Sequence, residues 1–435
     1  MRILVVTHTF PWPENSGARL RVANIVRALA RAGEVDLFCM VSRNERREAD
    51  EVIPTLDEPV ARVGCSIRRG VPYRVRTVAR WMVGSRLPYE IGPRDYSGVR
   101  SELSAWAKPP YDLVWMSHAE SFSALGGMVD APTIVDLDDL EDQKMAAKLQ
   151  AGAGGSSLPR GTGATAPRAL LHRWGALVHT AVNSRRWKAL QRHIAGSVET
   201  IVVCSRLDQQ RLGVTNSAVV PNGYSPPSRP VGREDVRQPP TVVLAGSFSY
   251  TPNADAARYL VLEVVPRIRV RIPEVKVRLV GHHDDRIADL ASEDVVLTGR
   301  VPDIEAELAR ADVVVVPIRF GGGTRIKILE AFAHRIPVVS TSVGCEGLDI
   351  ASGEHLLIAD DPDGLAEGSI ELLTDLDKRQ SIVNRAHDLY TSRYRWDRIA
   401  PRIVELARGA AGSKPAERTH DTGEPVPSVH GRSAT

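Results

Sequence analysis

The chain has 435 residues, of which 43% are hydrophobic and 25% charged, so it can bury large cores and is longer than one domain usually is. Its formal net charge of +3 is small for this length, so composition does not favour a general nucleic-acid binder. The four cysteines are scattered without a Cys-x-x-Cys pair, which argues against a zinc site or a disulfide framework and favours a reducing cytoplasm. The N-terminus lacks the apolar core of a signal peptide, and no stretch approaches the roughly 20 apolar residues of a membrane span.

The first apolar run, "RILVVTH", predicts a buried strand, and the loop "THTFPWPENSGARLR" leads from it into a helix. Gly17 stands beside Ser16, which is a good N-cap residue. Free backbone N–H groups at this helix end can face a bound anion. The alternative is a plain strand-to-helix turn.

His118 follows the apolar run "YDLVWMS", just beyond a predicted strand end. An imidazole at this position can hydrogen-bond a substrate hydroxyl or donate a proton to a leaving phosphate. The alternative is that His118 only caps the next helix.

The acidic segment "VDLDDLED", with Asp136, Asp138 and Asp139, resembles the carboxylate clusters that bind divalent metals. Acidic residues after a strand also serve as N-caps, and no second acidic cluster is recognisable as a partner. We therefore predict helix caps and no metal site.

Residues 150–168 are rich in Gly, Ser, Thr, Ala and Pro and predict a flexible surface loop. In residues 168–194, cationic side chains are interleaved with Leu and with Trp174 and Trp187, as in a basic amphipathic helix. Such a helix can lie on an anionic membrane. The alternative is an ordinary amphipathic helix that packs its apolar face on the domain.

Apolar runs and helical patterns alternate along most of the chain, which predicts doubly wound parallel sheets. The proline-rich stretch 221–240 separates two sets of strands, so we place the domain boundary there. Two such domains create a cleft, and ligands in these folds bind at the carboxyl ends of the strands. Residues after 411 are almost free of apolar side chains and predict a disordered tail over 412–435.

The segment "ADVVVVPIRFGGGTRIKILE" places a glycine turn after a buried strand and opens a helix at the expected N-cap Thr324. Glycines and a helix N-terminus let an anion approach the main chain closely. Arg325 and Lys327 add positive charge in the first turn, and Glu330 can accept hydrogen bonds from a ribose. The alternative is a simple turn followed by a solvated helical ion pair.

Four segments carry a resemblance to the family-4 retaining glycosyltransferases, which have the two-domain GT-B fold. "PIRFGGGTRIKILEAFAHRIPVVSTSVGCEGL" resembles their donor-site motif, and "PWPENSGARLRVANIVRALARAGEVDLF" resembles their N-terminal glycine loop and helix. "VVPNGY" resembles the family's interdomain crossing, and "LTGRVPDIEAELARADVVVVP" its nucleotide-base loop. Thr-Arg-x-Lys before the glutamate is similar to a glycine-rich variant found among sugar transferases of bacterial polysaccharide clusters.

Two departures from the family pattern stand out. The family usually has two glutamates in the donor motif, and Glu330 matches the second, whereas the first falls on Gly322. The loop "LAGSFSYTPNADA" lacks the Arg and Lys that the family commonly places against the diphosphate. We expect backbone N–H groups to replace the first glutamate, and Arg325 and Lys327 to replace the two cations.

The resemblance implies two Rossmann-like α/β domains facing each other across a cleft. The N-terminal, acceptor-side domain spans 1–220 and is completed by a C-terminal helix, 394–410. The nucleotide-sugar-binding domain spans 241–393.

The implied activity is a hexosyl-type transfer from a nucleotide diphosphate sugar to an acceptor hydroxyl, with retention, in glycan or glycolipid biosynthesis. We expect no cofactor and no obligatory metal. The expected acceptor is a sugar or a lipid-linked sugar, and the expected location is the cytoplasm, with peripheral contact at the inner face of the membrane through 168–194. Two alternatives remain open: a GT-B nucleotide-sugar epimerase and an inactive nucleotide-sugar-binding regulator.

The predicted site joins these segments. Catalytic roles fall to His118, Arg325 and Lys327. The expected donor contacts are Gly17, Gly246, Ser247, Gly299, Val301, Gly321, Gly322, Gly323, Thr324 and Glu330.

Overall fold

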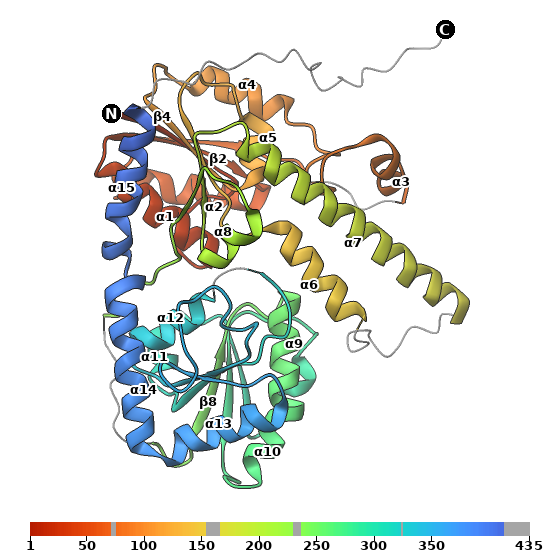
Figure 1. Cartoon of the computed structure of the whole chain (residues 1–435), viewed down its shortest axis with the longest axis vertical. Helices are drawn as coiled ribbons and strands as arrows, with labels where there is room; N and C mark the ends of the chain where they lie inside the picture. Colours follow the sequence, from red (N-terminus) through yellow and green to blue (C-terminus); the bar gives the residue numbers. More distant parts are fainter. Residues whose placement is uncertain (71–74, 154–165, 229–235, 323–324, 413–435) are drawn as a thin grey trace.

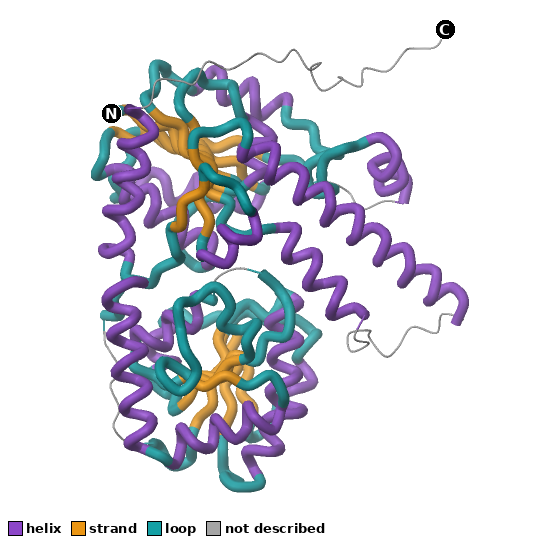
Figure 2. Tube along the Cα trace, in the orientation of Figure 1, coloured by secondary structure: helices purple, strands orange, loops and turns teal. Residues whose placement is uncertain are grey.

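The computed structural model describes residues 1–70, 75–153, 166–228, 236–322 and 325–412. These residues form two parallel sheets with helices packed on their faces, one sheet above the other in Figure 1. The expected pair of doubly wound α/β domains is confirmed. Figure 2 shows the strands gathered at the centre of each domain, with helices outside them.

The N-terminal sheet has the strand order β3-β2-β1-β4-β5-β6-β7. Its strands are β1 (Arg2–Thr7), β2 (Glu34–Val41), β3 (Arg62–Ile67), β4 (Leu113–Ser117), β5 (Thr133–Asp136), β6 (Thr200–Val203) and β7 (Ser217–Val219). The helices of this half are α1 (Gly17–Ala30), α2 (Arg43–Val52), α3 (Val75–Gly84), α4 (Ser97–Trp106), α5 (Ala119–Leu125), α6 (Glu141–Ala153), α7 (Ala166–Ala195) and α8 (Arg206–Leu212). A short 3-10 turn, Ile53–Thr55, follows α2.

The C-terminal sheet has the strand order β10-β9-β8-β11-β12-β13. Its strands are β8 (Thr241–Ala245), β9 (Lys276–Val280), β10 (Val295–Gly299), β11 (Val313–Val316), β12 (Val338–Ser340) and β13 (Leu357–Ile358). The helices in this half of the chain are α9 (Thr251–Tyr259), α10 (Val265–Arg269), α11 (Ile304–Leu308), α12 (Ile326–Ala333), α13 (Pro362–Thr374), α14 (Leu376–Leu389) and α15 (Trp396–Gly412). Two π-helical segments, Leu260–Val264 and Tyr390–Tyr394, continue α9 and α14, and a 3-10 turn lies at Ala288–Leu290.

The central strands β4, β8 and β11 are buried over their whole length because helices cover both faces of each sheet. Strand β11 consists of four consecutive buried valines, and all five residues of β8 are buried. A strand with one solvated face would alternate apolar and polar residues instead. The uninterrupted apolar runs in the sequence therefore predicted the layered fold correctly.

The chain order reverses once in each sheet. In the N-terminal sheet, β1 lies between β2 and β4, and in the C-terminal sheet β8 lies between β9 and β11. Loops that leave the carboxyl ends of such neighbouring strands diverge to opposite faces and open a crevice. The loops after β1, β4, β8 and β11 are therefore where a ligand site is expected.

The chain crosses between the domains twice, and the crossings touch. The Tyr224 N–H donates to Tyr394 O over 2.9 Å, and a Cβ added at Gly223 would lie 2.9 Å from the same oxygen. After this contact α15 packs on α1, where Trp396 and Ile403 join the core of the N-terminal domain. Figure 1 shows α14 and α15 running along one edge of both domains.

Helices α6 and α7 pack side by side and extend outward from the N-terminal domain (Figure 1). The predicted loop at 150–168 is shorter than expected, because residues 150–153 belong to α6 and residues 166–168 to α7. The remaining loop residues lie outside the described part of the chain. The predicted tail, apart from Gly412 at the end of α15, lies outside it as well.

Candidate active site

Glycines line the carboxyl ends of β8, β9 and β10 in the C-terminal domain. Gly246 follows β8 with φ +151°, and Gly281 follows β9 with φ +134°. The Gly281 N–H donates to the Gly299 carbonyl over 3.1 Å, and a Cβ at Gly281 would overlap the Gly246 carbonyl. Side chains are excluded here, so the surface exposed to a ligand is main chain.

Lys327 projects from α12 towards this glycine surface. Its Nζ donates to Asn253 Oδ1 over 2.8 Å, and a Cβ at Gly246 would lie 3.0 Å from the same Nζ. Burial lowers the pKa of Lys327 from 10.5 to about 7. Lys327 lies beside a glycine turn, and protonating it costs free energy while the site holds no anion. Such a lysine is suited to binding a phosphate oxygen.

Glu330 lies one turn further along α12 and is connected to the interdomain crossing. Its Oε1 accepts a hydrogen bond from the Tyr224 hydroxyl over 3.1 Å. Burial raises the pKa of Glu330 from 4.5 to about 7, against the opposing effects of the Tyr224 hydrogen bond and Lys327. The carboxylate that was predicted to hold ribose therefore contacts the interdomain crossing directly.

Arg325 is buried and turned back on the glycine loop, where its Nη1 donates to the Gly322 carbonyl. Its Nε has no hydrogen-bond partner among the described residues. The expected N-cap is one residue early: α12 begins at Ile326, and Arg325 occupies the N-cap position. Gly323 and Thr324 lie outside the described residues.

Gly17 brings the N-terminal glycine loop against α12. Ser16 caps α1 as predicted, accepting the Arg19 N–H over 3.4 Å. A Cβ at Gly17 would lie 2.9 Å from Cδ1 of Ile326, the first residue of α12. The starts of α1 and α12 therefore face each other across the domain boundary, and both present free backbone N–H groups there.

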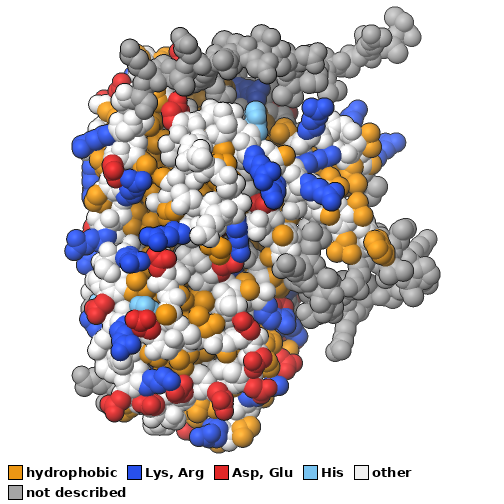
Figure 3. All heavy atoms as spheres, in the orientation of Figure 1, with side chains coloured by type: hydrophobic (Ala, Val, Ile, Leu, Met, Phe, Trp, Pro, Cys, Tyr) orange, Lys and Arg blue, Asp and Glu red, His pale blue; other side chains and the backbone are white. Residues whose placement is uncertain are grey.

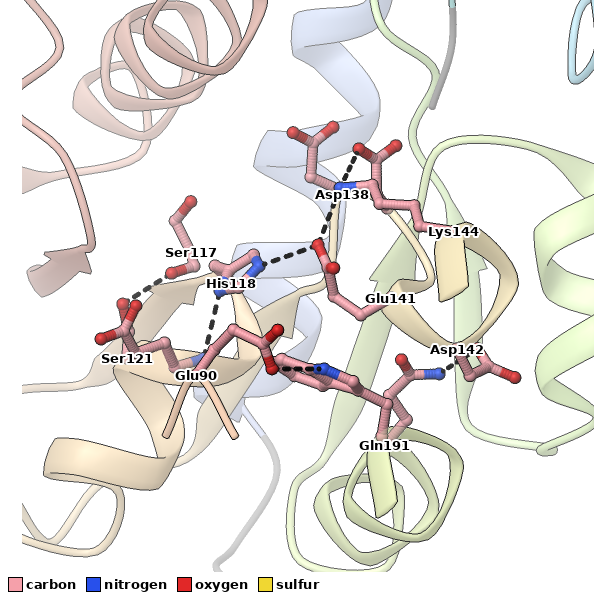
Figure 4. Close-up of polar contacts among 12 residues, drawn as sticks. Glu90, Ser117, His118, Ser121, Asp138, Glu141, Asp142, Lys144 and Gln191 are labelled. Carbon is pink, nitrogen blue, oxygen red and sulfur yellow. Dashed lines mark hydrogen bonds and ion pairs between the residues drawn. The ribbon is translucent and has the colours of Figure 1, made fainter. Parts of the chain in front are cut away.

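His118 stands at the carboxyl end of β4 with φ 72° and ψ 146°, a conformation that only glycine adopts readily. Its Nδ1 accepts the Glu120 N–H over 3.2 Å, so in this network the ring proton lies on Nε2. Nε2 lies 3.5 Å from Glu141 Oε1 (Figure 4). His118 thus caps α5 through one nitrogen and directs the other towards Glu141.

His8, at the end of β1, is the neighbour of His118 across the reversal point of the N-terminal sheet. The two ring centroids are 4.6 Å apart. Burial and the charges of neighbouring cations lower the pKa of His8 to about 3, so it is neutral at physiological pH. Sequence reasoning missed His8, although its position directly after the first buried strand was the available signal.

Asp136, the last residue of β5, and Asp138 do not act as the predicted helix caps. Asp136 is buried and forms a bidentate pair with Arg21, at 2.9 Å from Nε and 2.7 Å from Nη2. Asp138 accepts from Asn222 Nδ2 over 3.2 Å. Among the residues that the structure describes, no group of three or more His, Cys, Asp or Glu is arranged to hold a metal ion.

Lys144 of α6 was not singled out from the sequence. Its Nζ lies 2.6 Å from Asp139 and 2.7 Å from Glu141, the residue that faces His118 (Figure 4). A Cβ at Gly322 would lie 2.5 Å from Lys144 Cγ. The stem of Lys144 therefore fills the space next to the position where the resembling family has its first glutamate.

Two expected donor contacts lie at the margin of this cluster. Ser247 is exposed, and its Oγ lies 2.8 Å from Ser249 Oγ. Val301 is half-buried against the core of the C-terminal domain, two residues after Gly299. No contact that the structure gives joins either side chain to Lys327 or Glu330, so their roles stay predictions.

Comparison with protein families places a known domain over much of the C-terminal half. Residues 239–375 match the family model described as glycosyl transferases group 1. The chain is 27% identical over 241 residues to phosphatidyl-myo-inositol mannosyltransferase of Mycobacterium tuberculosis. That match covers 52% of this chain and 62% of the relative's length.

Solved structures agree with the chain over nearly its whole length. Sucrose-phosphate synthase from Thermosynechococcus elongatus superposes with a TM-score of 0.64 at 17% identity, covering 94% of this chain and 99% of the other. HepE of Anabaena, in complex with UDP and glucose, gives 0.62 at 14% identity, covering 94% and 100%. The GT-B fold and the expected resemblance to GT-B glycosyltransferases are confirmed, whereas retention and membership of family 4 stay predictions.

Proposed function

We propose that this chain, which has the GT-B fold and carries a glycosyl transferases group 1 domain, moves a sugar from a nucleotide diphosphate sugar to an acceptor hydroxyl with retention at the anomeric carbon. The observation that carries the proposal is the arrangement on α12. Lys327 faces the glycine surface at Gly246, and Glu330 lies one turn away beside Tyr224 of the interdomain crossing. Lys327 complements the negative charge of a diphosphate, and the Glu330 carboxylate can accept hydrogen bonds from the hydroxyls of a ribose.

The residues around the glycine loop supply what departure of a nucleoside diphosphate needs. The bond from the anomeric carbon to the diphosphate oxygen breaks, and negative charge develops on that oxygen. Lys327, Arg325 and the free N–H groups at the start of α12 stabilise this charge without a metal. A new bond forms from the anomeric carbon to the acceptor oxygen, whose proton passes to the departing phosphate.

His118 holds the sugar in this scheme. With Nδ1 occupied by the Glu120 N–H, Nε2–H is the donor available to a sugar hydroxyl, in exchange for Glu141. The strained backbone at His118 supports a role in which the imidazole must be held in one position. We assign it substrate orientation as its main role.

The proposed acceptor is a sugar carried on a membrane lipid, and helices α3 and α7 support this choice. Neither helix sequence contains an acidic residue. Arg186 joins the two helices, since its guanidinium lies 4.3 Å from the Trp81 ring centroid. Figure 3 shows Lys and Arg side chains gathered over this part of the molecule, and Val83, Trp174 and Val178 are 93%, 62% and 45% exposed.

No described helix is long and apolar enough to cross a bilayer, so the contact proposed here is with the membrane surface. The apolar face of α7 is divided, because Trp187 is buried in the domain whereas Trp174 is exposed. The α3–α7 surface should bind liposomes that contain anionic lipid and release them in high salt.

A charge reversal tests this surface. Arg186 is unsuitable because it donates to the carbonyls of α3, so the exposed Arg185 and Lys188 are changed to glutamate. Liposome sedimentation should be lost in this variant and kept in a control with the same net charge, Arg398→Glu with Arg408→Glu on α15. Equal loss in both variants would contradict a specific surface.

The activity is tested by incubating the protein with a panel of nucleotide sugars, with and without a bacterial glycolipid extract. Lipid-dependent release of nucleoside diphosphate, with sugar incorporated into lipid, supports the transferase. A new nucleotide sugar formed from donor alone would favour an epimerase. Tight donor binding without any turnover would favour a nucleotide-sugar-binding regulator.

A further inference from the structure

Two of the four cysteines lie side by side in the N-terminal sheet, although they stand far apart in the sequence. Cys39 of β2 and Cys65 of β3 are partners in the register of these parallel strands. Successive side chains of a strand point to opposite faces, so register partners in a parallel pair share a face. Cys39 belongs to the hydrophobic core between the sheet and helices α1, α2 and α15, and Cys65 packs against the same core. The two thiols are therefore neighbours on one face of the sheet.

The two thiols differ in their access to solvent. Cys39 is fully buried, whereas Cys65 is half-buried on β3, an end strand of the sheet. All four cysteines of the chain are free. A small reagent from solution would therefore reach Cys65 first, and the neighbouring thiol on the inner strand is that of Cys39. This is the arrangement of a reactive cysteine next to a resolving cysteine.

The surroundings of Cys65 favour its thiolate, which is the reactive form of a cysteine. A hydrogen bond from Cys39 and the charge of Arg46 lower the pKa of the Cys65 thiol. Burial and the carboxylates of Asp50 and Glu45 oppose this shift without cancelling it. Arg46 is held beside Cys65 because its Nη1 donates to the Cys65 carbonyl over 2.7 Å. Burial raises the pKa of the Cys39 thiol, so Cys39 stays protonated where Cys65 ionises.

The row of residues that contains the two cysteines ends at the N-terminal glycine loop, residues 8–17. Thr7, the last residue of β1, is the register partner of Cys39 on its other side. The Thr7 hydroxyl donates to the Thr9 carbonyl over 2.6 Å, and the Thr9 hydroxyl donates to Glu45 of α2 over 2.6 Å. The start of the loop is therefore held by Thr7 and by α2, which both lie beside the cysteine pair.

We propose that Cys39 and Cys65 form a reversible disulfide that loosens the N-terminal glycine loop and thereby lowers the affinity for the donor. The effect on donor affinity rests on the proposed function, whereas the disulfide and the change in the loop do not. In reducing compartments, disulfides are mostly transient and serve as sensors.

The oxidant in this proposal is a peroxide. The Cys65 thiolate attacks one oxygen of hydrogen peroxide, the O–O bond breaks, and a sulfenic acid forms with release of hydroxide. The Cys39 sulfur then attacks the Cys65 sulfur, so that the S–O bond breaks, the S–S bond forms and the Cys39 proton leaves with the oxygen as water. Two thiols and one peroxide thus give one disulfide and two waters. Two molecules of a small thiol such as glutathione reverse the reaction and are themselves oxidised to a disulfide.

Forming the S–S bond draws β2 and β3 together at this level of the sheet. A disulfide requires Cβ atoms about 3.5–4.5 Å apart, whereas neighbouring strands lie about 4.7–4.9 Å apart. Cys39 must therefore move towards β3 and away from Thr7. This movement weakens the support of the N-terminal glycine loop at its first residues.

Peptide mapping and hydrogen exchange, both by mass spectrometry, test the disulfide and its effect on the loop. The parent treated with hydrogen peroxide should yield a peptide that joins Cys39 to Cys65, and dithiothreitol should separate the two halves. Amide exchange in residues 8–17 should become at least about threefold faster in the oxidised parent. Cys65→Ser should show neither change. The control Cys345→Ala, which removes a buried cysteine of the other domain, should show both.

Titration calorimetry with a panel of nucleotide sugars tests the effect on the donor. Affinity should fall about tenfold on oxidation and recover on reduction in the parent and in Cys345→Ala, and should stay constant in Cys65→Ser. Equal affinity before and after oxidation of the parent would overturn the link between the disulfide and donor binding.

Three results would overturn the inference as a whole: no peptide joins Cys39 to Cys65, dithiothreitol does not reduce the disulfide, or exchange in residues 8–17 is unchanged after oxidation. If no nucleotide sugar binds the reduced parent, the proposed function fails, and peptide mapping and hydrogen exchange still decide the inference. Cys39→Ala replaces Cys65→Ser if circular dichroism shows that Cys65→Ser does not fold.

Discussion

Replacing Lys327 by methionine tests whether this lysine binds the diphosphate of the donor, because methionine keeps an unbranched stem and removes the charge. The lost interaction is a charge-assisted hydrogen bond, worth about 1.5–3 kcal/mol. We therefore expect Lys327→Met to bind a nucleotide sugar roughly 10- to 150-fold more weakly near pH 7. Titration calorimetry with a nucleotide sugar is the suitable assay, because its diphosphate is esterified at both ends and keeps a constant charge in the neutral range.

The pH dependence of this affinity separates Lys327 from Glu330. The pKa of Lys327 in the empty site is about 7, so binding above that pH requires proton uptake. Affinity should then fall by up to about tenfold per pH unit on the alkaline side. The pKa of Glu330 is also about 7, and the ribose requires its carboxylate, so affinity should fall on the acid side as well.

The parent should therefore show a maximum near neutral pH, with an alkaline limb due to Lys327 and an acid limb due to Glu330. Lys327→Met should remove the alkaline limb alone, and Glu330→Gln should remove the acid limb alone. A flat profile in the parent, or limbs that persist in both variants, would refute the assignment of these two groups.

Four further outcomes are expected. Gly322→Glu should reduce the rate of sugar transfer, because its Cβ would lie 2.5 Å from Lys144 Cγ. Adding Lys144→Ala should restore part of this rate, and no recovery of the rate would contradict the packing argument. Glu330→Gln should raise the free energy of unfolding at pH 8 by at most about 3 kcal/mol in urea titrations and leave it nearly unchanged at pH 4. The raised pKa makes the folded parent lose stability progressively between about pH 4.5 and pH 7, and the glutamine removes this loss. Arg21→Met should cost about 3–5 kcal/mol in the same assay by leaving Asp136 buried without its partner, and a loss below 1 kcal/mol would argue against that pair. Turnover should survive EDTA, whereas loss rescued by manganese would return the aspartates after β5 to consideration as ligands.

The sheets were predictable because their determinants are local. Four consecutive valines in β11 indicate a strand whose two faces are both covered, and Pro317 directly after them marks its end. The placement of Lys327 and Glu330 on one helix followed from the same short segment. Spacing along a helix fixes which side chains share a face, so no distant information was needed.

The errors arose where a distant residue decides the outcome. Asp136 was expected to cap a helix, but its partner is Arg21, 115 residues earlier in the chain. Lys144 reaches Gly322 only because α6 of one domain packs against a loop of the other. Neither pairing leaves a periodic signal in the sequence, because side-chain partners across a domain boundary are set by the assembled fold.

The central claim is that α12 and the facing glycine loops bind a nucleotide diphosphate sugar. Thermal unfolding of the parent and of Glu330→Gln in the presence of a nucleotide-sugar panel tests it most directly. The parent should gain about 2.7 kcal/mol with at least one nucleotide sugar at 100 times its dissociation constant, and Glu330→Gln should lose most of that gain at the same concentration. If no nucleotide sugar stabilises the parent, or if Glu330→Gln is stabilised equally, the assignment of this site is wrong.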